Sequence, residues 1–250
     1  MKTLALTLLF VFSVFYSISY AIDDPSLIFY CPFEEGSGDS TKDVRSNLVG
    51  KFKGGTKWAN KGKVGKGIEF TDASSSIEFP EDAIMDITEA ITMEAWILPN
   101  AVQGDSALMG RRTAANAGGY CMQWTAGKIE TWIHIGGWQG TRDKQKIIPK
   151  PGEWHHVAGV FTGSEILQYV NGELDIKFSV GGKAGSVKEP FRIGQAQTGL
   201  TSMLGFIDEV AVYKRALKPE EIKSDMEKGV IAPVSPAGNL VTVWGRIKDR

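Results

Sequence analysis

The sequence predicts an all-β fold, a two-sheet antiparallel jelly-roll sandwich with one short helix near the C-terminus. Three observations support this fold class. Apolar residues alternate with polar ones in many short runs, turn-forming residues such as Gly, Asn, Asp and Ser separate these runs, and helical periodicity occurs once, at 219–228. Regular short strands broken by turn residues are typical of antiparallel sandwiches and jelly rolls.

The predicted elements follow one another from residue 27 onward. Strands are expected at 27–33, 67–70, 76–80, 91–98, 107–110, 120–124, 129–135, 154–161, 166–170, 174–178, 191–194 and 205–213. In the helix predicted at 219–228, Pro219 and two acidic residues suit the first turn. Gly229 suits its end, because glycine readily leaves the helical conformation.

The clearest local signal is a hairpin near the middle of the chain. The runs 166–170 and 174–178 flank Asn171-Gly172, and both central positions of a type I′ turn need the positive φ that Asn and Gly tolerate. The run 154–161 has apolar residues on both of its alternating faces. We therefore expect it to form a strand that is covered on both sides.

Three segments are expected along the chain. Residues 1–21 combine an early lysine, a long apolar run and small residues before a cleavage site, the pattern of a secretory signal peptide. An uncleaved anchor is the alternative, because the run is close to the roughly 17 residues that a membrane span needs. Residues 22–229 suit a single all-β domain, and 230–250 form a tail punctuated by Pro and Gly. We expect a secreted or cell-surface protein with no membrane span in the mature chain.

The charge balance excludes some partners. The chain carries 28 Lys and Arg residues against 29 Asp and Glu residues, which gives a net charge of −1. Nucleic acids and anionic membrane surfaces attract proteins with a clear excess of basic residues. Neither is therefore expected as a partner.

Two cysteines, Cys31 and Cys121, permit one disulfide in an exported chain. Both lie within apolar runs, where a buried free thiol behaves as a small hydrophobic group. A bridge requires the two Cα atoms to lie within roughly 7 Å of each other. The sequence leaves both alternatives open.

Ligand-binding residues are predicted from the aromatic and loop composition. The alternation at 129–135 puts Glu130, Trp132 and His134 on the face opposite the isoleucines, and Trp138 follows in a Gly-rich loop. Aromatic rings beside polar side chains suit the apolar faces and the hydroxyl groups of sugars. The candidate ligand-binding residues are Trp132, His134, Trp138, Gln139, Arg111 and Arg112. For each of them, simple packing or a solvated surface position is the alternative.

A buried carboxylate is predicted in the last strand. In the run 205–213, Asp208 alternates in phase with Phe206, Val210 and Val212, which have the character of core residues. A carboxylate in such a place needs a cation or several hydrogen-bond donors. Pairing with an arginine, or capping of a loop, are the alternatives to a metal ion.

A family resemblance rests on the order of several sequence blocks within 27–228. They read FEEGSG, DVRSNLVG, KWANKGKVGKGIEF, TMEAWILP, WHHVAGVF, LQYVNGEL, FRIG and FIDEVAVYKRALKPEEI. The chain thereby resembles bacterial laminin G-like domains of the concanavalin A-like lectin/glucanase superfamily. The resemblance implies a two-sheet jelly roll outside the cell, attachment to glycans or partner proteins, and a structural calcium ion. The residues that match the calcium ligands of the family are Asp43 and Asp208, with Asn47 as a third.

The function is not settled by this resemblance, because one scaffold houses lectins, adhesion modules and glycosidases. A retaining glycosidase needs two carboxylates ~5 to 5.5 Å apart. The nearest pattern here, Glu173, Asp175 and Lys177, ends in a base where a third acid is expected. We predict a secreted, non-catalytic module for attachment that binds extracellular glycans. A protein-interaction or structural surface module is the alternative, and a glycoside hydrolase is a more distant one.

Overall fold

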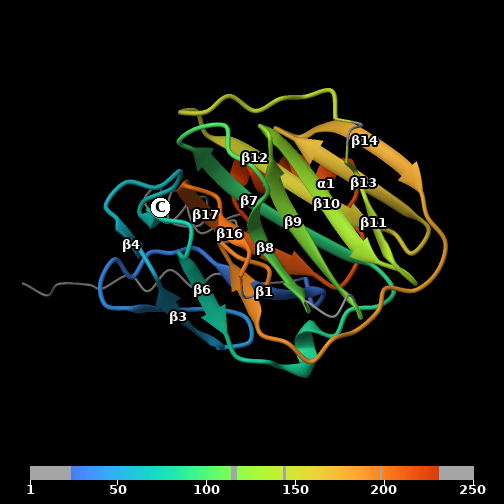
Figure 1. Cartoon of the computed structure of the whole chain (residues 1–250), viewed down its shortest axis with the longest axis horizontal. Coiled ribbons are helices and arrows are strands. Elements are labelled where there is room, and N and C mark those ends of the chain that lie inside the picture. The colour runs from blue at the N-terminus through green and yellow to red at the C-terminus, as the bar shows by residue number, and fades with distance from the viewer. Residues whose placement is uncertain (1–23, 114–116, 143–144, 198, 231–250) are drawn as a thin grey trace, which may run out of the picture. The chain divides into compact units, whose positions relative to one another are not determined.

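A computed structural model describes residues 24–230 of the chain, apart from 114–116, 143–144 and 198. In this part the strands form two mainly antiparallel sheets that pack face to face, with one α-helix on the outside (Figure 1). The predicted jelly-roll sandwich is confirmed. No helix among these residues is long and apolar enough to cross a membrane. The predicted signal peptide, 1–21, and the tail beyond residue 230 lie outside the described residues.

The strands divide between an eight-stranded and a nine-stranded sheet. The eight-stranded sheet has the order β14 (Glu173–Ser179), β13 (Glu165–Val170), β12 (His155–Phe161), β7 (Ile91–Pro99), β17 (Gly205–Tyr213), β5 (Gly67–Phe70) and β4 (Thr56–Ala59), with β1 (Leu27–Cys31) also paired to β17. The nine-stranded sheet has the order β11 (Trp138–Gly140), β10 (Lys128–His134), β9 (Gly119–Thr125), β8 (Ser106–Arg112), β15 (Phe191–Ile193), β6 (Ser76–Phe79), β3 (Val49–Lys53) and β2 (Ser40–Lys42), with β16 (Thr201–Ser202) parallel to β8. The helices are the 3-10 turn η1 (Ala83–Met85) and α1 (Pro219–Lys228).

The predicted hairpin joins β13 to β14. Asn171 and Gly172 both have positive φ, 52° and 76°, as the type I′ turn requires. The preceding strand, β12, is buried along its whole length and lies between β13 and β7. The prediction of a strand covered on both sides is therefore confirmed.

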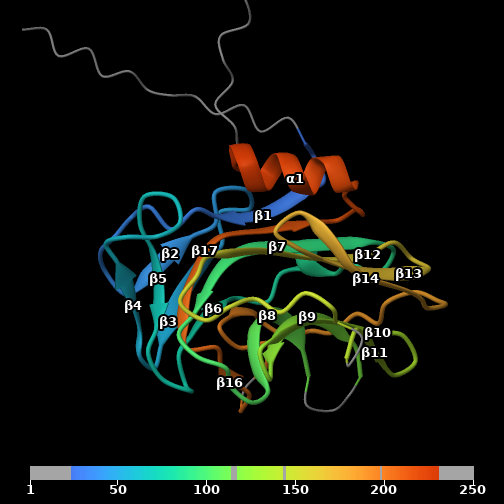
Figure 2. The same cartoon turned by 90° about the horizontal axis from the view of Figure 1, so that it is seen from above.

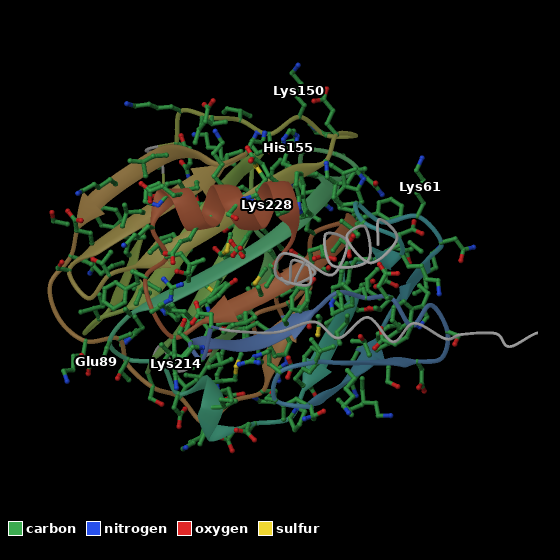
Figure 3. All side chains as sticks on the ribbon, turned by 180° about the vertical axis from the view of Figure 1, so that it is seen from behind. Lys61, Glu89, Lys150, His155, Lys214 and Lys228 are labelled. Carbon is green, nitrogen blue, oxygen red and sulfur yellow. The ribbon has the colours of Figure 1, made fainter. Side chains whose placement is uncertain are left out.

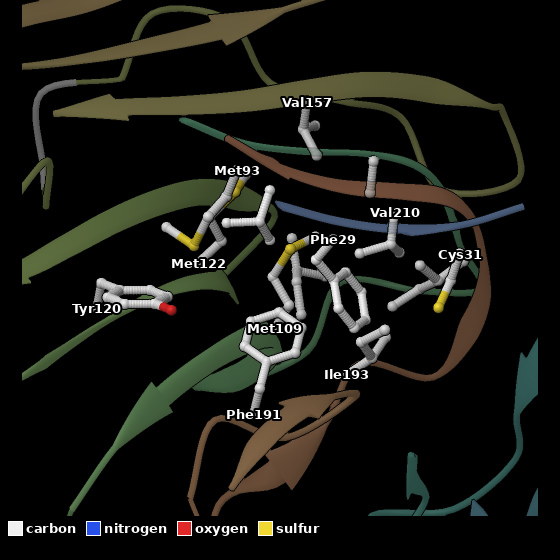
Figure 4. Close-up of a cluster of buried hydrophobic side chains, with 14 of the residues drawn as sticks. Phe29, Cys31, Met93, Met109, Tyr120, Met122, Val157, Phe191, Ile193 and Val210 are labelled. Carbon is white, nitrogen blue, oxygen red and sulfur yellow. The ribbon is translucent and has the colours of Figure 1, made fainter. Parts of the chain in front are cut away.

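The core fills the space between the two sheets. Phe29 of β1 meets Phe79 of β6 and Phe191 of β15 edge-on, with ring centroids 4.8 and 5.0 Å apart. Figure 4 shows Phe29 and Phe191 beside Met109 and Ile193 in this cluster. Burial of each such side chain stabilises the fold by about 1.5–3 kcal/mol, so these contacts hold the sheets together.

The two cysteines lie in different places. Cys31 of β1 is part of the core between the sheets, whereas Cys121 of β9 packs with Ala107 and Ala196 in a separate small cluster. Both are buried free thiols. The sequence left open a disulfide or two free thiols, and the structure has two free thiols.

A β-bulge in β17 corrects one prediction from the alternation. Val210 and Val212 point into the core, but the register shifts between Asp208 and Ala211, where Glu209 has a φ of 53°. The extra residue reverses the phase of the strand. Asp208 therefore lies on the face opposite Val210 and Val212, and the predicted shared face is wrong.

The helix has the predicted bounds and lies across the outer face of the eight-stranded sheet (Figure 2; Figure 3, with Lys228 labelled at its end). Its first turn is closed by Glu221, whose Oε2 accepts the backbone N–H of Lys218 at 2.7 Å. Tyr213 of β17 donates its hydroxyl to Asp225 of the helix at 2.7 Å. These contacts anchor α1 at its start and near its end.

Candidate ligand-binding site

The predicted aromatic residues gather on the outer face of strands β8 to β11. In the pairing of β10 with β11, Trp132 lies opposite Gly140 and His134 lies opposite Trp138. Residues that oppose each other share a face of the sheet, so both tryptophans and His134 are on one side. Ile133, between them, points into the core. We call this outer surface around Trp132 and Trp138 the tryptophan face.

Trp132 is enclosed within the tryptophan face. Its ring lies directly over Gly140, where an added Cβ would come within 2.3 Å of the indole. Its Nε1 donates to Oε2 of Glu130 at 2.9 Å, and the guanidinium of Arg142 lies 5.3 Å from the ring centroid. Glycine at position 140 is thus required for this packing, and the ring is held from both sides.

Trp138 is held by two other strands. The guanidinium carbon of Arg112, at the end of β8, lies 4.5 Å from the centroid of the Trp138 ring. The ring of His134 meets the indole edge-on at 5.4 Å. Arg112 also contacts Sγ of Cys121, at 3.8 Å from Nη1. Trp132 and Trp138 are both half-buried, and Trp138 lies on β11, the edge strand of the sheet.

Small residues form the floor of the tryptophan face. Ala107 of β8, Cys121 of β9 and Ala196 from the loop after β15 are fully buried beneath Trp132, Trp138 and Leu200. Burial raises the pKa of the Cys121 thiol to about 11, so the thiol is neutral at physiological pH. The floor is therefore apolar and uncharged, and the charges lie around it.

Two of the predicted ligand-binding residues lie elsewhere. Arg111 is 1% exposed and points away from the tryptophan face, where it binds Asp86 at 2.7 Å and Glu81 at 3.0 Å. Gln139 lies opposite Ile133 in the register and is exposed on the other side of β11. The alternation of the strands separates both residues from Trp138. Of the six candidates, the structure brings together Trp132, His134, Trp138 and Arg112.

The list of candidate residues left out three polar residues that belong to the tryptophan face. Glu130 is buried, with Oε1 3.5 Å from Nε of Arg142 and Oε2 bonded to Trp132. Gln123 of β9 is also buried and lies opposite Glu130. The period of two in 129–135 already placed Glu130 on the face of Trp132 and His134, and its hydrogen bond to Trp132 agrees with this. No local signal could have found Arg142. It follows β11 in the sequence, and only the pairing of β11 with β10 brings its side chain over the ring of Trp132.

The residues predicted to bind calcium are hydrogen-bonded to protein donors. Asp43 is buried, and its carboxylate accepts from the backbone N–H groups of Tyr30 at 2.7 Å, Arg45 at 3.0 Å and Ser46 at 2.6 Å. Ser46 also donates its hydroxyl to Asp43. Asp43 therefore caps its own loop and is not a solvated turn residue.

Asp208 has a similar role in another loop. Its Oδ2 accepts from the N–H groups of Lys63 at 2.9 Å and Val64 at 3.0 Å, and its Oδ1 accepts from Glu209 N–H at 2.9 Å. Asn47 is exposed, with a φ of 64°. The part of the chain that the structure describes contains no group of three or more His, Cys, Asp or Glu side chains placed to hold a metal. Calcium at Asp43, Asn47 and Asp208 stays a prediction, and it would require some of these hydrogen bonds to be replaced by metal–oxygen bonds.

The acidic pattern of β14 serves the fold. Asp175 is buried, and its Oδ1 accepts from the N–H groups of Lys146 at 2.7 Å and Ile147 at 2.8 Å. Lys177 pairs with Glu165 of the neighbouring strand at 2.9 Å. Asp175 therefore anchors the segment before β12 instead of facing solvent.

The chain matches the model of a known protein family. The model of the laminin G-like family described as the concanavalin A-like lectin/glucanases superfamily matches residues 71–223. This is more than half of the chain, and the protein therefore belongs to that family. No curated protein matches the sequence.

Solved structures share the fold at low sequence identity. Domain 4 of an extracellular arabinanase from Geobacillus stearothermophilus, solved with arabinotriose, has a TM-score of 0.65 at 19% identity and covers 80% of this chain and 98% of that one. The botulinum neurotoxin serotype D binding domain has a TM-score of 0.62 at 12% identity and covers 81% and 50%. A sialidase from Trypanosoma rangeli has a TM-score of 0.56 at 15% identity and covers 82% and 33%. The chain thus spans about half of the toxin domain and a third of the sialidase, and the likeness shows the fold alone.

Proposed function

We propose that this protein is a non-catalytic carbohydrate-binding module and that the tryptophan face is its ligand site. The observation that carries the proposal is the placement of two half-buried indoles, Trp132 and Trp138, on the outer face of one sheet, each beside an arginine. Sugar recognition needs aromatic surface for the apolar ring faces and polar groups for the hydroxyls. The arabinanase domain solved with arabinotriose supports this class of ligand on the same fold.

The charges of the tryptophan face support binding and not hydrolysis. Glu130 is buried and engaged by Trp132 and Arg142, so its oxygens already have partners. A general acid or nucleophile of a glycosidase must reach the scissile bond from a position beside a second carboxylate. The other acid near Arg142 is Asp105, which is exposed at the rim of the sheet. Glu130 and Asp105 both pair with Arg142, and this arrangement suits a structural role.

Substitution of Trp138 by alanine tests the proposal. We expect Trp138→Ala to raise the Kd for a bound oligosaccharide at least about tenfold, because it removes one of the two aromatic stacking surfaces. The ligand is found on a glycan array that includes arabino-oligosaccharides, and the Kd is measured by isothermal titration calorimetry.

Gln139→Ala is the matched control, because Gln139 is exposed on the opposite side of the same strand. It should leave the Kd unchanged. An array on which the folded wild-type protein binds no glycan would contradict the proposal and favour a protein-binding surface module.

Export and calcium belong to the proposal as well. The N-terminal pattern of residues 1–21 supports secretion, and a position outside the cell is where a module for attachment to glycans would act. A structural calcium ion would bind through Asp43, Asn47 and Asp208, as the family resemblance implies. The support for this ion is the family resemblance, because both buried aspartates already accept hydrogen bonds from backbone N–H groups.

A further inference from the structure

Arg112 has unused hydrogen-bonding capacity beside Trp138. Its guanidinium stacks on Trp138, and its hydrogen bond to the thiol of Cys121 is long and weak. Its Nε is buried and has no hydrogen-bond partner among the residues that the structure describes. A buried donor without an acceptor is unfavourable, because it loses its hydrogen bond to water without gaining another. The site therefore has a cation that is positioned but not neutralised.

The other arginine of the tryptophan face provides a comparison. Arg142 lies over Trp132 in a similar stack, but it pairs with Glu130 and with Asp105, each at 3.5 Å. No carboxylate among the described residues forms an ion pair with Arg112. The neighbouring Cys121 thiol is neutral, because burial raises its pKa to about 11. Of two similar arginine–tryptophan stacks, one is satisfied by the protein and the other is not.

We propose that Arg112 and Trp138 form a subsite for an acidic sugar, one that carries a carboxylate on its ring as uronic acids do. A guanidinium presents parallel donors that match the two oxygens of a carboxylate, and stacking on an aromatic ring fixes the plane of those donors. The part of the indole that Arg112 does not cover offers the apolar surface on which the ring of the same sugar packs. This inference rests on the proposed carbohydrate-binding function and names the class of sugar.

The experiment compares sugars that differ only in the carboxylate. The probes are oligomers of galacturonic, glucuronic and mannuronic acid, each measured beside its carboxyl-reduced neutral counterpart by isothermal titration calorimetry. For at least one pair, the wild-type protein should bind the acidic oligomer about tenfold more tightly or better, as expected for a charge-assisted bidentate contact. Added salt should weaken that binding, because the contact is electrostatic.

Two substitutions of Arg112 test the subsite, and a third variant controls for the loss of a positive charge elsewhere. Arg112→Gln should remove the preference for the acidic oligomer, and Arg112→Lys should retain only part of it, because lysine lacks the planar fork. Lys57→Gln should keep the preference, since Lys57 lies on β4 of the other sheet and pairs with Glu69. Thermal melts of each variant verify that it is folded.

The outcomes distinguish this inference from the proposed function. Equal affinity for acidic and neutral oligomers, or an unchanged preference in Arg112→Gln, would overturn the acidic subsite. If Trp138→Ala still abolished binding in that case, the carbohydrate-binding function would stand. Failure of the wild-type protein to bind any oligomer, acidic or neutral, on the probes and on the array would overturn both.

Discussion

Arg111 and Arg112 are adjacent in the sequence and have opposite environments. Because side chains alternate across a strand, Arg111 points inward to Asp86 and Glu81, whereas Arg112 points outward to Trp138. The inward arginine is buried with its charge compensated on the spot, and it ties β8 to the segment around η1. The outward arginine is available to a ligand. At the scale of single residues, the side of the strand decides the role.

The two aspartates predicted to bind calcium can be tested at the same scale. The calcium proposal predicts that a chelator lowers the melting temperature of the wild-type protein and leaves that of Asp208→Asn unchanged. The physical reason is that an ion bound only to the folded state stabilises it by mass action. Differential scanning fluorimetry with and without chelator measures both values.

The hydrogen bonds of Asp208 must be separated from any effect of calcium. The carboxylate accepts from Lys63, Val64 and Glu209, so Asp208→Asn should lower the melting temperature even in the presence of chelator. Asp105→Asn, at the exposed rim, should behave like the wild type. A wild-type melting temperature that does not respond to chelator would refute the calcium site and leave Asp208 as a loop cap.

At the scale of elements, helix α1 covers ionisable groups on the outer face of the eight-stranded sheet. Glu94 of β7 is fully buried there, with Oε2 3.8 Å from Nε2 of His156 on β12. Burial raises the pKa of Glu94 well above its ordinary value, and the neighbouring carboxylates of Asp225 on α1 and Glu209 on β17 raise it further. Burial also lowers the pKa of His156 to about 3, so the imidazole is neutral. Tyr213 completes this cluster through Asp225.

The pH dependence of stability follows from Glu94. Because the folded state holds this proton more tightly than the unfolded chain, the stability that Glu94 contributes is complete below its ordinary pKa of 4.5. It is lost as the pH rises toward the folded-state pKa. The stability of Glu94→Gln relative to wild type should therefore increase above about pH 4.5, by up to ~1.4 kcal/mol per pH unit. Urea unfolding at a series of pH values measures this difference.

Glu89→Gln is the surface control for that series. Glu89 is exposed and pairs with Lys183 at 2.6 Å, so its replacement should shift stability by no more than about 1 kcal/mol and with no such pH dependence. Parallel pH profiles for wild type and Glu94→Gln would show that Glu94 does not hold a proton under the helix.

At the scale of the whole molecule, the proposed export predicts that the chain is divided into a leader and a mature protein. We expect cleavage after Ala21, because small residues stand at the two positions that the peptidase inspects. Mass spectrometry of the chain exported by a bacterial host should find Ile22 at the N-terminus. Leu9→Arg should block export, since it places a charge in the apolar run. An exported chain that retains Met1 would contradict the cleavage.

The fold class was predictable because its signals are local. The period of two, the positive φ at Asn171 and Gly172, and the Pro219 start of the helix all act within a few residues. The same period predicts that Trp132 and His134 share a face, and the pairing of β10 with β11 agrees with it. It failed at Asp208, because a bulge adds one residue and reverses the phase of a strand without a clear sequence signal.

The sequence by itself therefore determined the sandwich, its hairpin, its helix and the shared side of Trp132 and His134. The tertiary structure decided which residues from distant segments complete the tryptophan face. Arg112 reaches Trp138 past Cys121 of an intervening strand, and Arg142 returns to Trp132 and Glu130. Local periodicity fixes only the direction of a side chain. Its neighbours depend on strand order and on long-range packing, which no short stretch of sequence contains.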